Sequence, residues 1–311
     1  MRLGAIDIGT NTVLMLIADV RSDGSLEVVR DEHFIGRLGK GVDEHGIIQT
    51  DTFHRIHDIL FQLKTIADSL GVTQLTACGT SALRDAKNRQ DFINFIKQKL
   101  AFEIRILSGT EEAELTYLGT VSNFLPNTTP ENYAVVDIGG GSTEIIVGSG
   151  TRVASSQSID IGSVRLTERI LKNNPPSDHA LATATRLVQD HLHSISPLSP
   201  SITLIGVAGT LTTLSALDLR IPRYDNILVH RHILTIESIE KMFQELRPLT
   251  LDQLRRYPQI HPARADILLA GIIILREIVR KVNISKITVS DRGLRYGIAL
   301  KTAQTLLSNS F

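Results

Sequence analysis

Asp137-Ile138-Gly139-Gly140-Gly141-Ser142-Thr143-Glu144 directly follows the short apolar run Ala134-Val135-Val136. An apolar strand therefore leads into an acid, three glycines, two hydroxyl residues and a second acid. Glycines allow positive φ and, lacking Cβ, let backbone N–H groups approach a polyanion closely, while the two hydroxyl groups can add donors. The pattern favours a phosphate-binding loop. An ordinary glycine hairpin, with Ile145-Ile146-Val147 as the returning strand, also fits.

The two acids of this stretch, Asp137 and Glu144, flank the glycines. Two carboxylates would repel a bare phosphate group. Their presence therefore implies a divalent cation, or a water molecule that has to be oriented.

A partial echo of the same pattern lies near the N-terminus, in Asp7-Ile8-Gly9-Thr10-Asn11-Thr12. It again joins an apolar strand, Asp-Ile-Gly, a small polar turn and a second apolar strand. The two aspartates are 130 residues apart, which is the size of a domain and not of a short repeat. We therefore expect one motif used once in each of two related lobes, with a cleft between the lobes.

Bulk composition is that of an ordinary globular protein, with 42% hydrophobic and 21% charged residues in 311. At this length the chain is expected to form two domains. Lys plus Arg and Asp plus Glu balance at 33 each, so no global charge favours nucleic acid or a membrane surface. The single cysteine, Cys78, cannot form an internal disulfide. With no signal-like segment, a soluble protein of the reducing cytoplasm is expected.

Three further stretches follow predicted strands. Ala208-Gly209-Thr210 is a third glycine-hydroxyl turn that opens a helix. Arg37-Leu38-Gly39 belongs to a basic glycine loop without nucleotide P-loop spacing, and its role is left open. Glu111 and Glu112 begin a predicted helix, where carboxylates are explained either by capping and the helix dipole or by a general base at the cleft.

Taken together and in order, these motifs resemble the exopolyphosphatase/guanosine pentaphosphatase (Ppx/GppA) family over essentially the whole chain. The stretches that carry the resemblance are Asp7-Ile8-Gly9-Thr10-Asn11-Thr12, Arg37-Leu38-Gly39, Thr80-Ser81-Ala82-Leu83-Arg84, Ser108-Gly109-Thr110-Glu111-Glu112-Ala113, Asp137–Glu144, Gly206–Leu214, Arg264-Ala265-Asp266 and Ser290–Gly297.

The resemblance implies an α/β fold with the duplicated two-lobe architecture of actin, sugar kinases and the Hsp70 ATPase, and an interlobe cleft. Residues 1–123 with 298–311 are expected to form the first lobe and residues 124–297 the second. Longer members of the family carry further C-terminal domains.

The resemblance also implies residue roles. Glu112 aligns with the proposed catalytic base and Arg84 with an arginine that contacts the phosphate chain. Asp137 and Glu144 would hold Mg²⁺, or another divalent cation such as Mn²⁺, and position water. Gly209 and Thr210 match the turn that contacts nucleotide in kinase relatives. The phosphate-binding residues would be Asp7, Gly9, Thr10, Asn11, Thr12, Gly139, Gly140, Gly141, Ser142 and Thr143.

The expected activity is metal-dependent hydrolysis of terminal phosphoanhydride bonds in inorganic polyphosphate, and of pppGpp. The alternatives are a main activity on pppGpp, a kinase of the same superfamily, and a non-catalytic nucleotide-binding module. The expected partners are polyphosphate or guanosine penta- and tetraphosphate and a second copy of the chain, without nucleic acid or membrane. One departure is Glu114, where many relatives have arginine.

Overall fold

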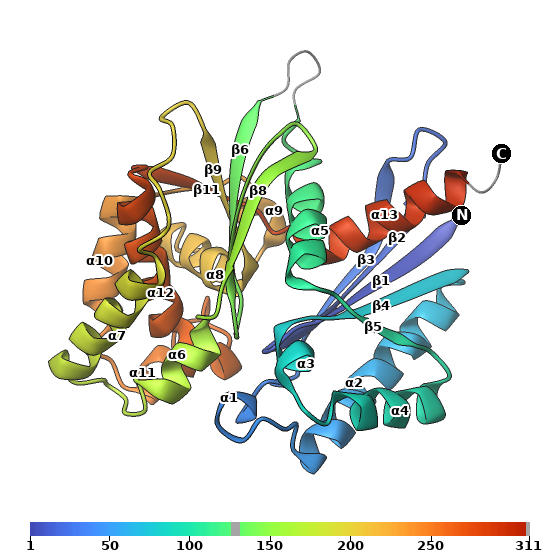
Figure 1. Cartoon of the computed structure of the whole chain (residues 1–311), viewed down its shortest axis with the longest axis horizontal. Coiled ribbons are helices and arrows are strands. Elements are labelled where there is room, and N and C mark those ends of the chain that lie inside the picture. Colours follow the sequence, from blue (N-terminus) through green and yellow to red (C-terminus); the bar gives the residue numbers. More distant parts are fainter. Residues whose placement is uncertain (126–130, 309–311) are drawn as a thin grey trace. The chain divides into compact units, whose positions relative to one another are not determined.

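The computed structural model describes residues 1–125 and 131–308. These residues form two compact units. Unit 1 comprises Met1–Asn123 together with the segment that begins at Gly293, and unit 2 comprises Phe124–Arg292 (Figure 1). Each unit consists of one mixed sheet with helices packed against it, so the expected α/β fold with two repeated lobes is confirmed.

Unit 1 has a five-stranded sheet in the order β3-β2-β1-β4-β5. Strands β1, β2 and β3 form an antiparallel meander, and β4 and β5 continue it in parallel. The strands are β1 (Arg2–Ile8), β2 (Thr12–Val20), β3 (Leu26–Ile35), β4 (Gln74–Gly79) and β5 (Ile104–Ile106). The helices are α1 (Val42–His45), α2 (Thr50–Ser69), α3 (Ser81–Asp85), α4 (Arg89–Leu100), α5 (Gly109–Val121) and α13 (Leu294–Ser308).

Alternation along β1 gives this sheet two buried faces. Ile6 and Ile8 belong to the apolar cluster that includes α2 and α4, whereas Leu3 and Ala5 belong to the cluster that includes α13. Successive side chains of a strand point to opposite faces, so the continuous apolar run of β1 is what a sheet covered on both sides requires. In Figure 1, α2 and α4 lie on one side of this sheet and α5 and α13 on the other.

Unit 2 has a six-stranded sheet in the order β10-β11-β9-β6-β7-β8. Its strands are β6 (Asn132–Ile138), β7 (Thr143–Ser149), β8 (Arg152–Ile159), β9 (Thr203–Val207), β10 (Ile233–Thr235) and β11 (Lys286–Val289). Its helices are α6 (Ser163–Arg169), α7 (Asp178–His191), α8 (Ala208–Asp218), α9 (Asn226–Val229), α10 (Ile236–Leu246), α11 (Leu251–Leu254), the short 3₁₀ helix η1 (Pro262–Arg264) and α12 (Ala265–Val282).

The two sheets share one topology. Strands β6, β7 and β8 repeat the antiparallel meander of β1, β2 and β3, and β9 and β11 repeat the parallel strands β4 and β5. The echo between the two Asp-Ile-Gly stretches is therefore the sequence trace of a structural repeat, with each stretch at the end of the first strand of its sheet.

The chain returns to unit 1 at Gly293, five residues before the predicted position 298. The reason is close packing of helix on helix. A Cβ at Gly297 would lie 1.8 Å from the carbonyl oxygen of Leu115, and one at Gly119 would lie 2.2 Å from that of Gly293. Glycines thus let the start of α13 touch the backbone of α5. In the part of the chain that the structure describes, no helix is long and apolar enough to cross a membrane.

Candidate active site

The glycine-rich stretch forms the turn of the β6–β7 hairpin. Gly139 N–H donates to the carbonyl of Ser142 at 3.0 Å and closes the turn. Asp137 lies directly opposite Glu144 in the antiparallel register. Residues paired in this way project from the same face of a sheet, with Cβ atoms ~5 Å apart. The hairpin therefore places the two predicted metal-binding acids side by side.

Helix α6 fixes the direction of the peptide groups in this turn. Ser163 N–H donates to the carbonyl of Gly139 at 2.9 Å, and the N–H groups of Val164 and Arg165 donate to that of Gly140 at 2.9 and 3.1 Å. In a trans peptide the C=O and N–H groups point in opposite directions. The N–H groups of Gly140 and Gly141 must therefore point away from α6, and among the described residues neither has an acceptor. The turn is built to offer donors to an anion.

Both hydroxyl residues of the turn, Ser142 and Thr143, are buried. Thr143 is fully buried, and its hydroxyl donates to the carbonyl of Ile161 at 2.6 Å. This contact secures the turn to the segment that precedes α6, and the contact of Thr143 with phosphate stays a prediction. Glu144 is also buried and accepts a hydrogen bond from the Ser158 hydroxyl at 2.8 Å.

The first of the two predicted phosphate loops, Asp7–Thr12 in unit 1, is built in the same way. Gly9 N–H donates to the carbonyl of Thr12 at 2.8 Å, as Gly139 does in the second loop. The carbonyls of Thr10 and Asn11 accept hydrogen bonds from the segment Gly36–Gly39, at 2.8 to 3.0 Å. The basic glycine loop, whose role the sequence left open, therefore supports the first of the two predicted phosphate loops, as α6 supports the second. The Asn11 N–H, which points the opposite way, has no acceptor in the described chain.

Two side chains of the first loop carry orphaned polar atoms. Oδ1 of Asp7 and Nδ2 of Asn11 are buried without a hydrogen-bond partner among the described residues. Burial and, after it, the negative charge of Glu112 together raise the pKa of Asp7 to about 7, against the opposing effect of the Arg295 cation. Buried polar atoms without partners are uncommon in proteins. Their presence marks a place where a water, cation or substrate atom would be satisfied.

The structure separates the two glutamates that begin α5. Glu111 completes a capping box with Ser108 and pairs with Arg105 on the exposed side. Glu112 points inward, is only 7% exposed, and forms an ion pair with Arg84 of α3. The helix-capping explanation therefore applies to Glu111, and Glu112 needs another. Glu114 is exposed, away from this pair.

The pKa of the Glu112 carboxyl group is raised above its ordinary value. Burial raises the pKa of its carboxyl group, the Arg84 guanidinium opposes that shift, and the nearby Asp85 carboxylate adds to it. Asp7, Arg84 and Glu112 are therefore brought within electrostatic reach of one another by β1, α3 and α5, although they are widely spaced in the sequence.

A buried arginine accompanies the third glycine-hydroxyl turn. The guanidinium of Arg264 lies against the start of α8, where a Cβ on Gly209 would fall 1.1 Å from Nη1. No carboxylate among the described residues pairs with it, and burial lowers the pKa of its guanidinium. A helix N-terminus attracts anions. The turn and Arg264 therefore form an electropositive corner in unit 2, which the prediction of Gly209 and Thr210 alone did not include.

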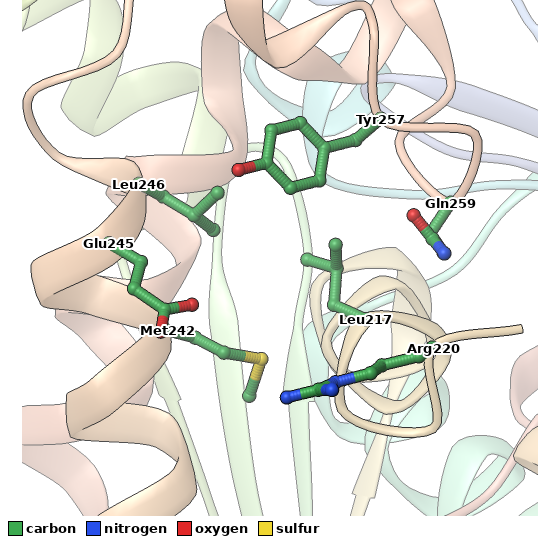
Figure 2. A pocket seen from close by; sticks show the side chains of 7 residues that line it. All are labelled: Leu217, Arg220, Met242, Glu245, Leu246, Tyr257 and Gln259. Carbon is green, nitrogen blue, oxygen red and sulfur yellow. The ribbon is translucent and has the colours of Figure 1, made fainter.

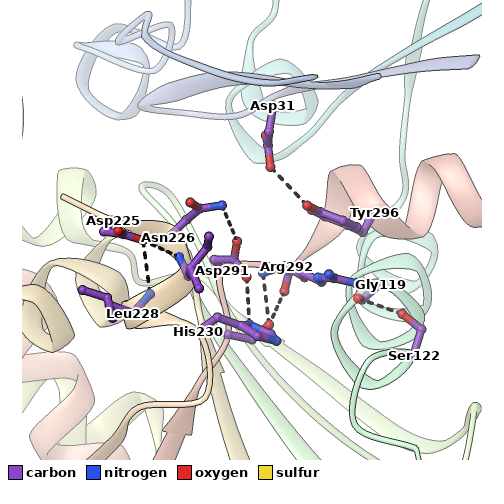
Figure 3. Close-up of polar contacts among 12 residues, drawn as sticks. Asp31, Gly119, Ser122, Asp225, Asn226, Leu228, His230, Asp291, Arg292 and Tyr296 are labelled. Carbon is purple, nitrogen blue, oxygen red and sulfur yellow. Dashed lines mark hydrogen bonds and ion pairs between the residues drawn. The ribbon is translucent and has the colours of Figure 1, made fainter. Parts of the chain in front are cut away.

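A second unpredicted feature holds Arg295 of α13 in unit 1. Asp31 of β3 accepts two hydrogen bonds from this guanidinium, at 2.8 and 2.7 Å. It also accepts one from the Tyr296 hydroxyl, at 3.2 Å (Figure 3). Arg295 is 4% exposed. The pair therefore fixes the cation that opposes the rise in the Asp7 pKa. Only its place in the Ser290–Gly297 motif pointed to Arg295 in the sequence.

A divalent cation needs oxygen ligands, which carboxylate side chains supply. No group of three His, Cys, Asp or Glu side chains within the described ranges is arranged as a metal cluster. The facing pair Asp137 and Glu144 supplies carboxylate oxygens, which Mg²⁺ and Mn²⁺ prefer, and Mg²⁺ is often held by one or two carboxylates with substrate phosphates and water as its other ligands. The residues present fit such an ion.

A cavity of about 240 Å³ lies elsewhere in unit 2 (Figure 2). None of the predicted site residues lines it. Its walls come from the end of α8, from α10 and from the segment before η1, and its lining residues are Leu217, Arg220, Met242, Glu245, Leu246, Tyr257 and Gln259. The cavity is therefore separate from the strand-end loops that carry the predicted site residues.

The repeated sheets, each with a phosphate-binding type of turn after its first strand, define a two-lobe protein of the actin-like class. The Ppx/GppA phosphatase family model matches residues 16–306. The chain therefore belongs to the Ppx/GppA phosphatase family.

Individual relatives agree with this assignment. The chain is 36% identical to exopolyphosphatase 2 of Mycobacterium tuberculosis, over 97% of this chain and 98% of that protein. It is 27% identical to the guanosine-5'-triphosphate,3'-diphosphate pyrophosphatase of Vibrio cholerae, over 97% of this chain but 59% of that longer protein. The crystal structure of the Ppx/GppA family member of Aquifex aeolicus aligns with a TM-score of 0.81 at 30% identity, covering 100% of this chain and 99% of that one.

Proposed function

We propose that this protein hydrolyses terminal phosphoanhydride bonds, with inorganic polyphosphate as its principal substrate and pppGpp as a second one. The observation that carries the proposal is the buried carboxylate of Glu112, paired with Arg84 and close to Asp7, in the lobe that also carries the first phosphate loop. A buried acid with a raised pKa suits a general base acting on water, whereas a non-catalytic binding module has no need of one.

Each part of the site has a role in this reaction. Backbone N–H groups of the two loops bind phosphoryl oxygens, and Arg84 adds a charge-assisted contact. Glu112 orients the attacking water and accepts its proton. A Mg²⁺ or Mn²⁺ ion held by Asp137 and Glu144 would neutralise charge on the phosphoryl oxygens, where most catalysis of phosphoryl transfer arises.

Polyphosphate is placed first because the relative named exopolyphosphatase 2 matches over its full length. The relative named for guanosine-5'-triphosphate,3'-diphosphate is less similar and is longer than this chain. The corner formed by Gly209, Thr210 and Arg264 supports the second substrate, because it offers a further anion site that a nucleotide with phosphate chains at two positions can use.

The test is phosphate release from matched amounts of medium-chain polyphosphate and pppGpp, with Mg²⁺, with Mn²⁺ and with EDTA. Metal-dependent release that is faster from polyphosphate supports the proposal, and faster release from pppGpp reverses the order of substrates. Transfer of phosphate only when an acceptor alcohol is present would indicate a kinase, and ATP binding without turnover would indicate the binding module.

We further propose that the protein acts in the cytoplasm as a homodimer and binds neither nucleic acid nor membranes. The family resemblance supports the dimer, and the equal numbers of acidic and basic residues give no general attraction to nucleic acid or anionic lipid. Light scattering coupled to gel filtration tests the dimer, and a single monomeric mass across concentrations would contradict it.

A further inference from the structure

The ion pair between Arg84 and Glu112 uses only part of the arginine. Nη1 of Arg84 donates to the Glu112 carboxylate and, at 3.2 Å, to the carbonyl of Leu107. An arginine side chain carries five N–H donors. Those on Nη2 and Nε have no acceptor among the described residues, and the side chain is 22% exposed. Half of the guanidinium is therefore occupied by the base, and the other half is open to a ligand.

The charges around Glu112 make its ionisation depend on the pair with Arg84. The groups that act on its carboxylate are the cation of Arg84 and the acid of Asp85, and Glu112 in turn acts on Asp7. Arg295 acts on Asp7. Among these groups Arg84 alone favours ionised Glu112. When the guanidinium is drawn away, a buried carboxylate remains among other acids, and such a group is far more basic.

We propose that the Arg84–Glu112 ion pair is a latch that a bound polyphosphate opens. Phosphoryl oxygens bind the open half of the guanidinium, compete for its charge and draw it off the carboxylate. Glu112 then becomes an effective proton acceptor only when the substrate is in place. This inference rests on the proposed function, because it assumes that a polyphosphate binds at Arg84.

The alternative is that the pair is a fixed structural contact joining α3 to α5. The two cases differ in whether ligand binding changes the protonation of Glu112. A latch that opens makes Glu112 more basic, so ligand binding takes up a proton from solvent at pH values between its free and bound pKa. A fixed pair leaves the protonation of Glu112 unchanged. Asp7 and the phosphate groups also titrate, and the charge of Glu112 raises the pKa of Asp7. Every protein in the comparison below, including the one with the wild-type Arg84–Glu112 pair, therefore carries Asp7→Asn.

The experiment is isothermal titration calorimetry of tripolyphosphate binding without divalent metal, which prevents turnover, in two buffers of different ionisation enthalpy from about pH 6 to 8. The number of protons taken up is compared between the wild type and Glu112→Gln, which keeps the size of the side chain. We expect the wild type to take up more protons over part of this range. Glu111→Gln is the matched control, since it removes the neighbouring, exposed acid and should match the wild type.

A variant of the arginine completes the test. In Arg84→Ala the latch is open before the ligand arrives, so its proton uptake should fall to that of Glu112→Gln even if its affinity is weaker. Equal proton uptake by the wild type, Glu112→Gln and Glu111→Gln would overturn the latch and leave the proposed function standing. Failure of tripolyphosphate to bind any of them would overturn both.

Discussion

At the scale of single residues, orientation on one helix turn decides what Glu111 and Glu112 do. The side chain of Glu111 returns to Ser108 and caps the helix, and that of Glu112 enters the protein beside Arg84. Consecutive helical residues point about 100° apart, so adjacent acids of the same type have separate tasks. The sequence alone left capping and catalysis open for both.

Replacement of Glu112 by glutamine should lower kcat by ~10²–10⁴-fold, the usual contribution of a positioned general base. The fold should persist, because glutamine keeps the shape of the side chain. Phosphate release from polyphosphate measures the effect. Glu111→Gln should retain activity, since glutamine also completes a capping box. Equal losses in both variants would show that Glu112 has no special role.

The raised pKa of Asp7 makes stability depend on pH. The folded protein holds its proton up to about pH 7, whereas an unfolded chain releases it near pH 4. The contribution of Asp7 to the free energy of unfolding is therefore fully present below about pH 4. It is lost as the pH rises to about 7, and the loss is on the order of 4 kcal/mol. Asp7→Asn should remove this loss and be more stable than the wild type at pH 8 in metal-free buffer.

Urea unfolding at intervals between about pH 4 and 8 checks this prediction. The two proteins should be similarly stable at the acid end and diverge as the pH rises. If the free energies of unfolding of the wild type and Asp7→Asn change in parallel with pH, Asp7 titrates in the folded protein as it does in an unfolded chain.

The residue pattern indicated most members of the site but not their partners. Asp7, Glu112, Asp137 and Glu144 stand in short motifs that can be read locally. The pairing of Asp31 with Arg295 joins residues 264 apart, and no local pattern encodes it. The position of Arg264 against Gly209 likewise depends on how η1 packs on α8.

At the scale of elements, each phosphate loop depends on a neighbouring segment that binds its carbonyl groups. In unit 2 this segment is the start of α6, and in unit 1 it is Gly36–Gly39. The sequence predicted the strand-turn-strand pattern of both loops, because apolar strands and glycine turns have local signatures. It did not predict the supporting segments or the hydrogen bond from the Thr143 hydroxyl to Ile161, because both follow from contacts between elements.

Gly162→Ala should damage the second loop. Its Cβ would lie 2.4 Å from the carbonyl oxygen of Gly140, so the loop or α6 has to move. A shift of about 1 Å can lower activity ~10²-fold, and we expect a loss of that size in kcat/KM with a smaller loss of stability. Ser163→Ala is the matched control, because it removes only the hydroxyl contact to Gly139 at 3.2 Å. Full activity in Gly162→Ala would mean that the loop tolerates displacement.

At the scale of the whole molecule, the repeated sheet could be predicted from the sequence. The residue at which the chain returns to unit 1 was harder to predict. Two Asp-Ile-Gly motifs spaced by a domain length indicated the repeat. The return to unit 1 at Gly293 depends on glycine contacts between α13 and α5, which have no periodic signature.

A chain that stops at Arg292 should keep unit 2 and lose unit 1. Without α13, Asp31 loses its Arg295 partner, and the apolar side chains of Leu3, Ala5 and Leu16 lose their cover. Domains are stable by only ~5–15 kcal/mol, so the loss of a whole helix from the core should unfold the unit. Limited proteolysis should then cut before residue 124 and spare the fragment after it. Equal protection of both units would contradict this prediction.

The discontinuous first unit also sets an order of events during protein synthesis. Residues 1–123 leave the ribosome first, yet their sheet is covered on both faces only after residues from Gly293 onward have followed. Unit 2 needs only Phe124–Arg292 and can close while translation continues. The usual N-to-C order of domain folding is therefore reversed. The cluster of Asp7, Arg84 and Glu112 is assembled in a nascent chain only once its last helix has been made.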